Sequence, residues 1–299
     1  MSGESHRCGR VALVGRPNVG KSTLLNALVG SHLSIVSPRP QTTRHRILGV
    51  CSVPEGQIAF VDTPGLHRGA RRALNRSLNR AVHAALLEVH LAAQVIEAGR
   101  WTDEDEAVYA ALCGEPLPRL LVVNKIDRLS DRSRLLPFTA DLVRAHVFAE
   151  VLYVSARSGR DLDPLRQTLL RYLPAGPSIY EADALTDRSE RFLAAELVRE
   201  QLMLRLGEEL PYATTVEIER FEERADGLAE IHAVVWVERE GQRAIVIGAG
   251  GAMLKQVGSS ARHAMERLFG RRVLLRTWVK VRAGWSDDEV QLRRLGYTD

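Results

Sequence analysis

The sequence predicts an α/β chain of two domains, in which a doubly wound, mostly parallel sheet is followed by a smaller α+β domain. Three observations lead to this prediction. At 299 residues the chain is long enough to bury two hydrophobic cores. Its first part alternates short apolar runs with helical patterns, as domains built on a parallel sheet do. A cluster of helix-breaking residues, Leu173-Pro174-Ala175-Gly176-Pro177, then marks a domain boundary.

These observations assign residues 1–174 to the first domain, residues 175–205 to a linker and connecting helix, and residues 206–299 to the second domain. The three cysteines are scattered, without the spacing of a metal site or a disulfide framework, which fits a reducing compartment. The segment Met1–Arg10 lacks the apolar core of a secretory signal, and no apolar run is long enough to span a bilayer. We therefore expect a soluble, cytoplasmic protein.

The first apolar run, Val11–Val14, leads into a loop with the spacing G-x-x-x-x-G-K-S and then into a helical pattern. This is the arrangement of a phosphate-binding loop. Its glycines let backbone N–H groups curl around a polyphosphate, and the helix N-terminus adds partial positive charge. Lys21 would reach the β- and γ-phosphates, and the Ser22 hydroxyl would bind Mg²⁺. The expected phosphate contacts are Gly15, Arg16, Pro17, Asn18, Val19, Gly20, Lys21, Ser22 and Thr23.

Two further segments have the residues of nucleotide-dependent switches. A threonine in the polar stretch around Thr42 and Thr43 can complete a Mg²⁺ shell only when a γ-phosphate is present; a plain polar loop is the alternative. The strand run Ile58–Val61 ends at Asp62, which can hold Mg²⁺ through water, and the Gly65 amide can sense the γ-phosphate. The expected switch residues are Gln41, Thr42, Thr43, Arg44, Asp62, Thr63, Pro64, Gly65 and Leu66.

A third strand run, Leu120–Val123, ends in Asn124-Lys125-Ile126-Asp127. The Asp127 carboxylate can accept the N1–H and N2 hydrogens of guanine, a donor pair that adenine lacks, so we expect the nucleotide to be GTP. Asn124 would brace the loop, the Lys125 stem would cover the base, and the backbone of Ser155-Ala156 can meet the guanine O6. Each of these segments follows an apolar run, so all should meet at one edge of a parallel sheet.

Two residues of the first domain bear on hydrolysis. Leu66 cannot orient an attacking water as a glutamine could, so intrinsic hydrolysis should be slow or be completed by another group. Asn18 is a candidate ligand for a monovalent cation acting in place of an arginine finger. The alternative is that Asn18 only shapes the phosphate-binding loop.

The second domain has a marked charge asymmetry. Residues 183–230 contain 13 acids and 6 bases, whereas residues 243–282 contain 9 bases and 1 acid, which suggests that one face meets a polyanion. Asp187 and Glu190 resemble a capping box at the start of a helix, and two alternating strands should follow at Thr214–Phe221 and Ile231–Glu238.

In the basic part, we expect a strand over Ile245–Ile247 to lead into Gly248-Ala249-Gly250-Gly251 and then into a helix with Lys255. This is the G-x-x-G loop of a KH module, which clamps single-stranded RNA; a dinucleotide fingerprint would need an acidic residue that does not follow. A second helix is expected at Ser259–Phe269. The strand Val273–Arg282 would present a basic face with a tryptophan, suited to RNA or, alternatively, to blunting a sheet edge. The expected RNA contacts are Gly248, Ala249, Gly250, Gly251, Lys255, Arg262, Arg276 and Lys280.

Together these motifs closely resemble the Era family, bacterial GTPases with a C-terminal KH domain, over essentially the full length. The resemblance rests on the four first-domain motifs and on family-specific segments of the second half. These segments are Thr186-Asp187-Arg188-Ser189-Glu190-Arg191-Phe192, Glu209-Leu210-Pro211-Tyr212 and Gly284-Trp285-Ser286-Asp287-Asp288-Glu289. The resemblance implies a P-loop GTPase domain followed by a type II KH domain.

The resemblance also implies an assembly factor for the 30S ribosomal subunit that binds the 3′ end of 16S ribosomal RNA. GTP would favour RNA binding, hydrolysis would release the factor, and contact with the inner membrane would be peripheral. By position, Thr43 is the switch ligand of Mg²⁺ and Asn18 the potassium-associated asparagine. Gly250 stands where relatives commonly have a lysine, so one phosphate contact is missing. We expect a monomer. The alternative is a GTP-regulated switch with a protein or membrane effector, the small domain serving as a docking module.

Overall fold

The computed structural model describes residues 6–39, 42–62, 86–129, 131–207, 209–285, 288 and 290, and it forms two compact units. The first unit contains most of the chain up to Asp187. The second unit contains the chain from Arg188 onward together with the segment Ile35–Thr42.

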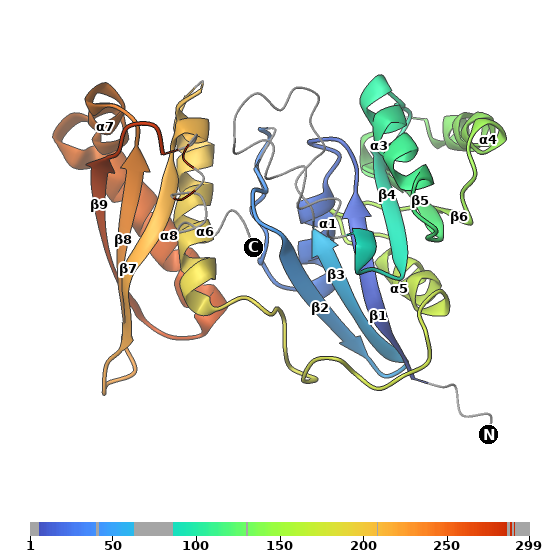
Figure 1. Ribbon diagram of the computed structural model, residues 1–299, viewed down its shortest axis with the longest axis horizontal. Helices are drawn as coiled ribbons and strands as arrows, with labels where there is room; N and C mark the ends of the chain where they lie inside the picture. The colour runs from blue at the N-terminus through green and yellow to red at the C-terminus, as the bar shows by residue number, and fades with distance from the viewer. Residues whose placement is uncertain are drawn as a thin grey trace. The chain divides into compact units, whose positions relative to one another are not determined.

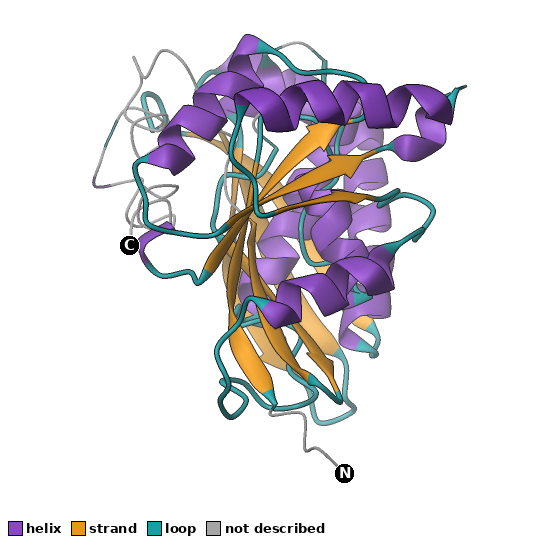
Figure 2. Cartoon of the chain, turned by 90° about the vertical axis from the view of Figure 1, so that its right-hand side faces the viewer, coloured by secondary structure: helices purple, strands orange, loops and turns teal. Residues whose placement is uncertain are grey.

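The first unit is built on a six-stranded sheet with strand order β2-β3-β1-β4-β5-β6 (Figures 1 and 2). Its strands are β1 (Arg7–Val14), β2 (Ile47–Val53), β3 (Gly56–Asp62), β4 (Leu91–Glu97), β5 (Arg119–Asn124) and β6 (Glu150–Tyr153). Only the pairing of β2 with β3 is antiparallel; the other described pairings are parallel. The mostly parallel sheet that the sequence predicts is therefore confirmed.

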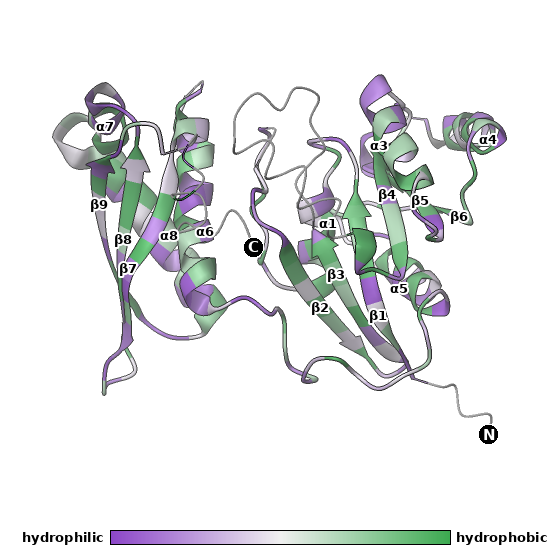
Figure 3. Cartoon of the chain, viewed as in Figure 1, coloured by the Kyte–Doolittle hydropathy of each residue, from purple (hydrophilic) through white to green (hydrophobic). Residues whose placement is uncertain are grey.

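The α-helices in the described part of this unit are α1 (Lys21–Val29), α3 (Asp103–Cys113), α4 (Leu135–Ala145) and α5 (Leu162–Arg171). The strands are mostly hydrophobic (Figure 3), as expected where helices cover both faces of a mainly parallel sheet. Val108 and Leu112 of α3 belong to one buried cluster with Ala12 and Val14 of β1 and Ala92 of β4. Helix α4, for which we made no prediction, packs through Leu135 and other apolar residues on β5.

The second unit has the order α6 (Glu190–Arg205), β7 (Thr215–Glu223), β8 (Ala229–Val237), α7 (Glu240–Ile247), α8 (Ala252–Phe269) and β9 (Val273–Val281). Strand β8 pairs antiparallel with β7 and parallel with β9. This is the smaller α+β domain expected from the sequence. Helices α6 and α8 bury their apolar faces on this sheet, with Val198, Leu202 and Met265 fully buried.

Helix α6 is more than the connection that we expected within residues 175–205. Its side chains Ala194, Leu197, Val198 and Leu202 belong to the core of the second unit. It begins at Glu190 with Ser189 as N-cap, whose Oγ accepts a hydrogen bond from the Phe192 amide at 3.3 Å. The expected Asp187–Glu190 capping box is therefore wrong: the shorter serine side chain, immediately before the helix, supplies the cap.

The strand expected over Ile245–Ile247 is also wrong, because these residues form the last turn of α7. Helix formation starts upstream, where the Gln242 side chain accepts hydrogen bonds from the amides of Glu238 and Arg239 at 2.8 and 3.1 Å. Only Val246 of the β-branched triplet is buried in the core, so tertiary packing outweighs the β-propensity of the sequence. The helix with Lys255 and the second helix expected at Ser259–Phe269 are one continuous helix, α8.

Several expected residues lie outside the described part of the chain: Gln41, Thr63, Pro64, Gly65, Leu66, Ser286, Asp287 and Glu289. Within the part that is described, no helix has the length and hydrophobicity needed to cross a membrane.

Candidate functional site

The loop between β1 and α1 has the backbone that its glycines predict. Gly15 and Gly20 have φ angles of 153° and 100°, which disfavour residues with a Cβ. A Cβ at Gly20 would also lie 2.5 Å from the Asn124 side-chain nitrogen, and one at Gly15 would collide with the Val95 carbonyl. Asn18 also has a left-handed backbone, with φ at 64°.

Lys21, the first residue of α1, lies inside this loop rather than in solvent. Its Nζ donates hydrogen bonds to the carbonyl oxygens of Gly15 at 2.8 Å and Arg16 at 3.0 Å. Burial lowers the pKa of Lys21 to about 8, because the ammonium loses hydration. A bound polyphosphate would supply the compensating negative charge, so the loop is arranged for such a ligand.

Three oxygen-bearing side chains converge at the N-terminal end of α1: those of Ser22, Thr43 and Asp62. The Ser22 Oγ lies 2.8 Å from Asp62 Oδ2 and 3.0 Å from Thr43 Oγ1. Ser34, which we did not predict, also donates to Asp62 Oδ2 at 2.7 Å. Desolvation by burial raises the pKa of Asp62, and within the described residues its Oδ1 has no hydrogen-bond partner.

This group fits a hard cation. Hydroxyl and carboxylate oxygens are the ligands that Mg²⁺ prefers, and the buried, unsatisfied Oδ1 can accept from a metal-bound water. The structure also indicates which of the two neighbouring threonines, Thr42 or Thr43, is the better candidate for the Mg²⁺ ligand. Thr42 Oγ1 donates to the Arg39 carbonyl at 2.7 Å, whereas Thr43 faces Ser22 and Asp62, which favours Thr43 as the ligand.

The expected guanine-binding residues come together at the ends of β5 and β6. Asn124 Nδ2 donates to the Val19 carbonyl at 2.9 Å, and its Oδ1 accepts from the Ala156 amide at 3.0 Å. It thereby ties the phosphate-binding loop to the Ser155-Ala156 segment. The Ser155 hydroxyl donates to Asp127 Oδ1 at 2.6 Å and lowers the pKa of this exposed carboxyl. Asp127 is therefore ionised at neutral pH, as an acceptor for two N–H groups must be.

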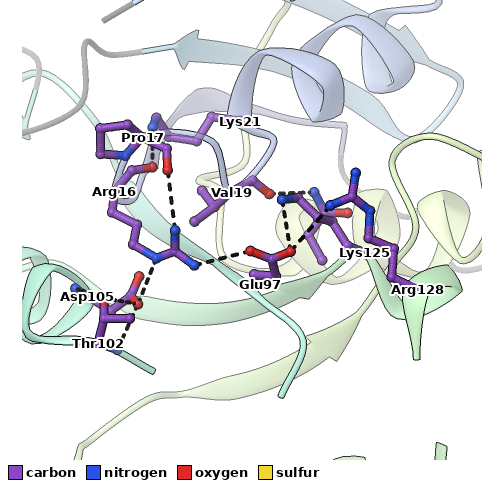
Figure 4. Close-up of polar contacts among 10 residues, drawn as sticks. Arg16, Pro17, Val19, Lys21, Glu97, Thr102, Asp105, Lys125 and Arg128 are labelled. Carbon is purple, nitrogen blue, oxygen red and sulfur yellow. Dashed lines mark hydrogen bonds and ion pairs between the residues drawn. The ribbon is translucent and has the colours of Figure 1, made fainter. Parts of the chain in front are cut away.

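The Arg16 side chain points toward the carboxylates of Glu97 and Asp105 (Figure 4). Its Nε lies 3.0 Å from Asp105 Oδ2, and one terminal nitrogen lies 3.3 Å from Glu97 Oε2. Arg16 can therefore contribute to phosphate binding through its backbone, while its guanidinium anchors the loop. Sequence reasoning missed both Glu97 and Asp105. The only available signal was their position, Glu97 at the end of a strand and Asp105 beside a helix start.

The G-x-x-G segment of the second unit joins α7 to α8. Gly248, Gly250 and Gly251 have φ angles of 74°, 56° and 80°, so three of its four residues adopt backbone that glycine favours. A Cβ at Gly248 would lie 2.7 Å from that of Met253. Lys255 is exposed one turn into α8. The loop thus offers bare backbone and one nearby cation to an anionic chain.

The other expected RNA residues are not all on this side of the domain. Thr277 faces α8, where a Cβ on Gly258 would lie 3.7 Å from its Oγ1. The alternating residues Arg276 and Lys280 therefore point to the opposite face of the sheet, where Lys280 lies 2.6 Å from Glu219. Arg262 pairs with Glu266 along α8 at 2.8 Å. The structure brings together the loop and Lys255, but not Arg276 and Lys280.

Comparison with known proteins agrees with this geometry. Residues 10–125 match the family model described as 50S ribosome-binding GTPase, and residues 209–286 match the KH domain. GTPase Era of Xanthomonas oryzae pv. oryzae (strain MAFF 311018) is 58% identical over 298 residues, covering 99% of each chain. The chain belongs to the Era family of GTPases. GTPase Era of Stenotrophomonas maltophilia (strain K279a) is likewise 58% identical over 292 residues, covering 98% of each chain.

Two solved structures of Era proteins share the fold at TM-scores of 0.94 and 37% identity, covering 98% of this chain and 100% of theirs. One is a variant of Aquifex aeolicus Era bound to GDP and AlF4⁻. The other is Era in complex with MgGDPNP and nucleotides 1506–1542 of 16S ribosomal RNA. The Era family therefore accounts for both units, and the chain is a GTPase that hydrolyses GTP, with a P-loop domain and a KH domain.

Proposed function

We propose that this GTPase is an RNA-dependent switch in the assembly of the 30S ribosomal subunit. In its GTP state it binds the 3′ end of 16S ribosomal RNA through the KH domain, and hydrolysis releases it. The observation that carries this proposal is the bare-backbone loop Gly248–Gly251 beside exposed Lys255, in a chain 37% identical to an Era that was solved with 16S ribosomal RNA. We further propose a monomer in the cytoplasm, with peripheral contact at the inner membrane.

In the nucleotide site, Ser22, Thr43 and Asp62 would hold the Mg²⁺ that accompanies GTP, and this ion would neutralise charge that develops on the phosphates. Lys21 would move from the carbonyls of Gly15 and Arg16 toward the β- and γ-phosphates. Asn124 and Ser155 hold the guanine-binding loop in place through the hydrogen bonds described above. These groups position the nucleotide, which is most of what phosphoryl transfer requires of a protein.

Contacts within the second unit support a coupling between nucleotide and RNA. The Arg199 guanidinium of α6 donates to the Thr42 carbonyl at 2.6 Å, and Glu200 Oε1 accepts from the Val36 amide at 3.0 Å. Thr42 directly precedes Thr43, the proposed Mg²⁺ ligand. A change in the conformation of the Thr43 loop on hydrolysis would therefore alter the contacts of this loop with α6, which forms part of the KH core.

The proposal is tested by the binding of a 3′-terminal 16S ribosomal RNA fragment with GDPNP and with GDP, each at low and high salt. We expect tighter, salt-sensitive binding with GDPNP. The double variant Glu196→Leu/Arg199→Leu should remove the difference between nucleotides, because it deletes the donor to Thr42 together with the carboxylate that pairs with this donor.

Glu196→Gln keeps the Arg199 donor, and its side-chain oxygen can still accept a hydrogen bond from the guanidinium, so this control variant should retain the difference. Equal binding in both nucleotide states by the unaltered protein would keep the RNA partner but reject the coupling. Absence of RNA binding in either state would favour a docking module for a protein or membrane effector.

We also propose that Asn18 supports hydrolysis by binding potassium. Its exposed side chain lies on a left-handed backbone within the phosphate-binding loop, a conformation that asparagine tolerates better than most residues. Hydrolysis should be about tenfold or more faster in potassium than in sodium, a modest share of what an arginine finger supplies.

Asn18→Gly keeps the backbone conformation and removes the amide oxygen, so it should hydrolyse GTP at the same rate with either ion. Steady-state phosphate release measures this. Equal rates for the unaltered protein would mean that Asn18 only shapes the loop.

A further inference from the structure

Glu97, the last residue of β4, lies between the two nucleotide-binding loops (Figure 4). Its Oε2 is 3.3 Å from an Arg16 nitrogen in the phosphate-binding loop. Its Oε1 is 3.1 Å from Lys125 Nζ in the guanine-binding loop, and 3.5 Å from the exposed Arg128 guanidinium. One oxygen of the Glu97 carboxylate thus contacts the phosphate-binding loop, and the other contacts the guanine-binding loop.

The sheet topology explains why this position reaches both loops. Strand β4 lies between β1 and β5, and all three are parallel. The phosphate-binding loop follows β1, and the guanine-binding loop follows β5. A side chain at the carboxyl end of the strand between them is therefore adjacent to both.

Both partners of Glu97 are held in place. Arg16 is 7% exposed, and its Nε is fixed by the fully buried Asp105, which also accepts from the Thr102 amide and hydroxyl at 3.0 and 2.8 Å. Lys125 has a left-handed backbone, with φ at 63°, and its side chain is largely buried. Little side-chain freedom is left to lose when these contacts form.

The ion pairs of Glu97 are also partly shielded from solvent, which strengthens their contribution to the contact between the two loops. The side chain of Glu97 is 23% exposed, and those of Arg16 and Lys125 are 9% and 18% exposed. Although partial burial acts to raise the pKa of Glu97, the hydrogen bonds and charges of Lys125 and Arg16 lower it overall. The Glu97 carboxylate is therefore ionised at neutral pH.

We propose that Glu97 is a positioning residue that couples the phosphate-binding loop to the guanine-binding loop, so that each half of a guanine nucleotide favours binding of the other half. The Asn124–Val19 hydrogen bond joins the same loops through a neutral contact. Glu97 adds the electrostatic connection. Ordering one loop then lowers the entropic cost of ordering the other, which slows nucleotide release.

Glu97→Gln keeps the shape of the side chain and removes its charge. It should accelerate release of a fluorescent GDP analogue by about tenfold, as expected for two partly shielded ion pairs. Release from the unaltered protein should also accelerate with added salt, whereas release from Glu97→Gln should respond little. Glu150→Gln is the matched control, because Glu150 makes a 3.0 Å ion pair with Arg171 at the start of β6, away from the loops.

Inorganic diphosphate separates coupling from simple support of the fold, because it occupies only the phosphate-binding loop. Lys125→Met, which keeps the side-chain stem, should weaken diphosphate binding about threefold to tenfold when Glu97 is present. The same substitution should have no effect in the Glu97→Gln background. Affinities follow from competition with the GDP analogue, and nucleotide-free melting temperatures report on folding.

Two outcomes of the diphosphate measurement would overturn the inference. In one, Lys125→Met leaves diphosphate affinity unchanged while Glu97 is present. In the other, Lys125→Met weakens diphosphate binding equally in both backgrounds, which would mean that Lys125 acts on the phosphate-binding loop without Glu97. An unchanged release rate in Glu97→Gln would reject the bridge altogether.

Discussion

Replacing Asp127 with asparagine is expected to weaken GTP binding by about 10²- to 10³-fold and to make xanthosine triphosphate the preferred nucleotide. The carboxylate is exposed at the end of the guanine-binding loop, and the Ser155 hydroxyl holds one of its oxygens at 2.6 Å. An ionised carboxylate accepts from both N1–H and the N2 amino group of guanine. An asparagine amide instead donates to the O2 carbonyl of xanthine, and it meets the guanine amino group with a donor of its own.

Equilibrium titration of both triphosphates against the two proteins measures this exchange of specificity. Asp131→Asn is the matched control, since it removes the same charge four residues further along. Asp131 is an exposed carboxylate that bonds Ser133, and its substitution should leave GTP affinity unchanged. A variant Asp127→Asn that still prefers GTP would remove this residue from base recognition.

Two aspartates in the G-x-x-G loop, Ala249→Asp with Gly250→Asp, should reduce RNA affinity by about 100-fold or more and leave GTP binding intact. The backbone of this loop must approach RNA phosphates closely, and new carboxylates would repel them. Gly250 has a φ of 56° with open space where a Cβ would stand, so aspartate fits sterically at the cost of a less favoured backbone.

The turn between β7 and β8 offers a closely matched control, Ala225→Asp with Gly227→Asp. Both control residues are exposed, and Gly227 has a φ of 75° with open space for a Cβ. The turn lies at the other end of α8: the Ala229 amide bonds the Arg272 carbonyl, just after this 18-residue helix of about 27 Å. Electrophoretic mobility shift of the RNA fragment compares the two double variants. Equal RNA binding by both would exclude the loop from the interface.

The sequence alone was enough to determine the nucleotide site, because its motifs are local. Each motif follows an apolar strand, and parallel strands must end at the same edge of a sheet, so their convergence could be predicted without coordinates. The meeting of Ser22 with Asp62 and of Ser155 with Asp127 follows this rule. The two-domain α/β fold was also predictable from local sequence. The alternation of apolar runs with helical patterns indicates the parallel sheet, and the helix-breaking cluster at residues 173–177 marks the domain boundary.

Where the local conformational preference of a segment competes with packing in the core, only the tertiary structure shows which of the two prevails. The triplet Ile245–Ile247 has strand propensity but forms the end of a helix, because Val246 is needed in the core of the second unit. Strand alternation places Arg276 and Lys280 on one face of β9, but only the structure shows that α8 covers the other face. Glu97 has no motif at all. Its role depends on β4 lying between β1 and β5, and strand order is a long-range property that no short stretch of sequence encodes.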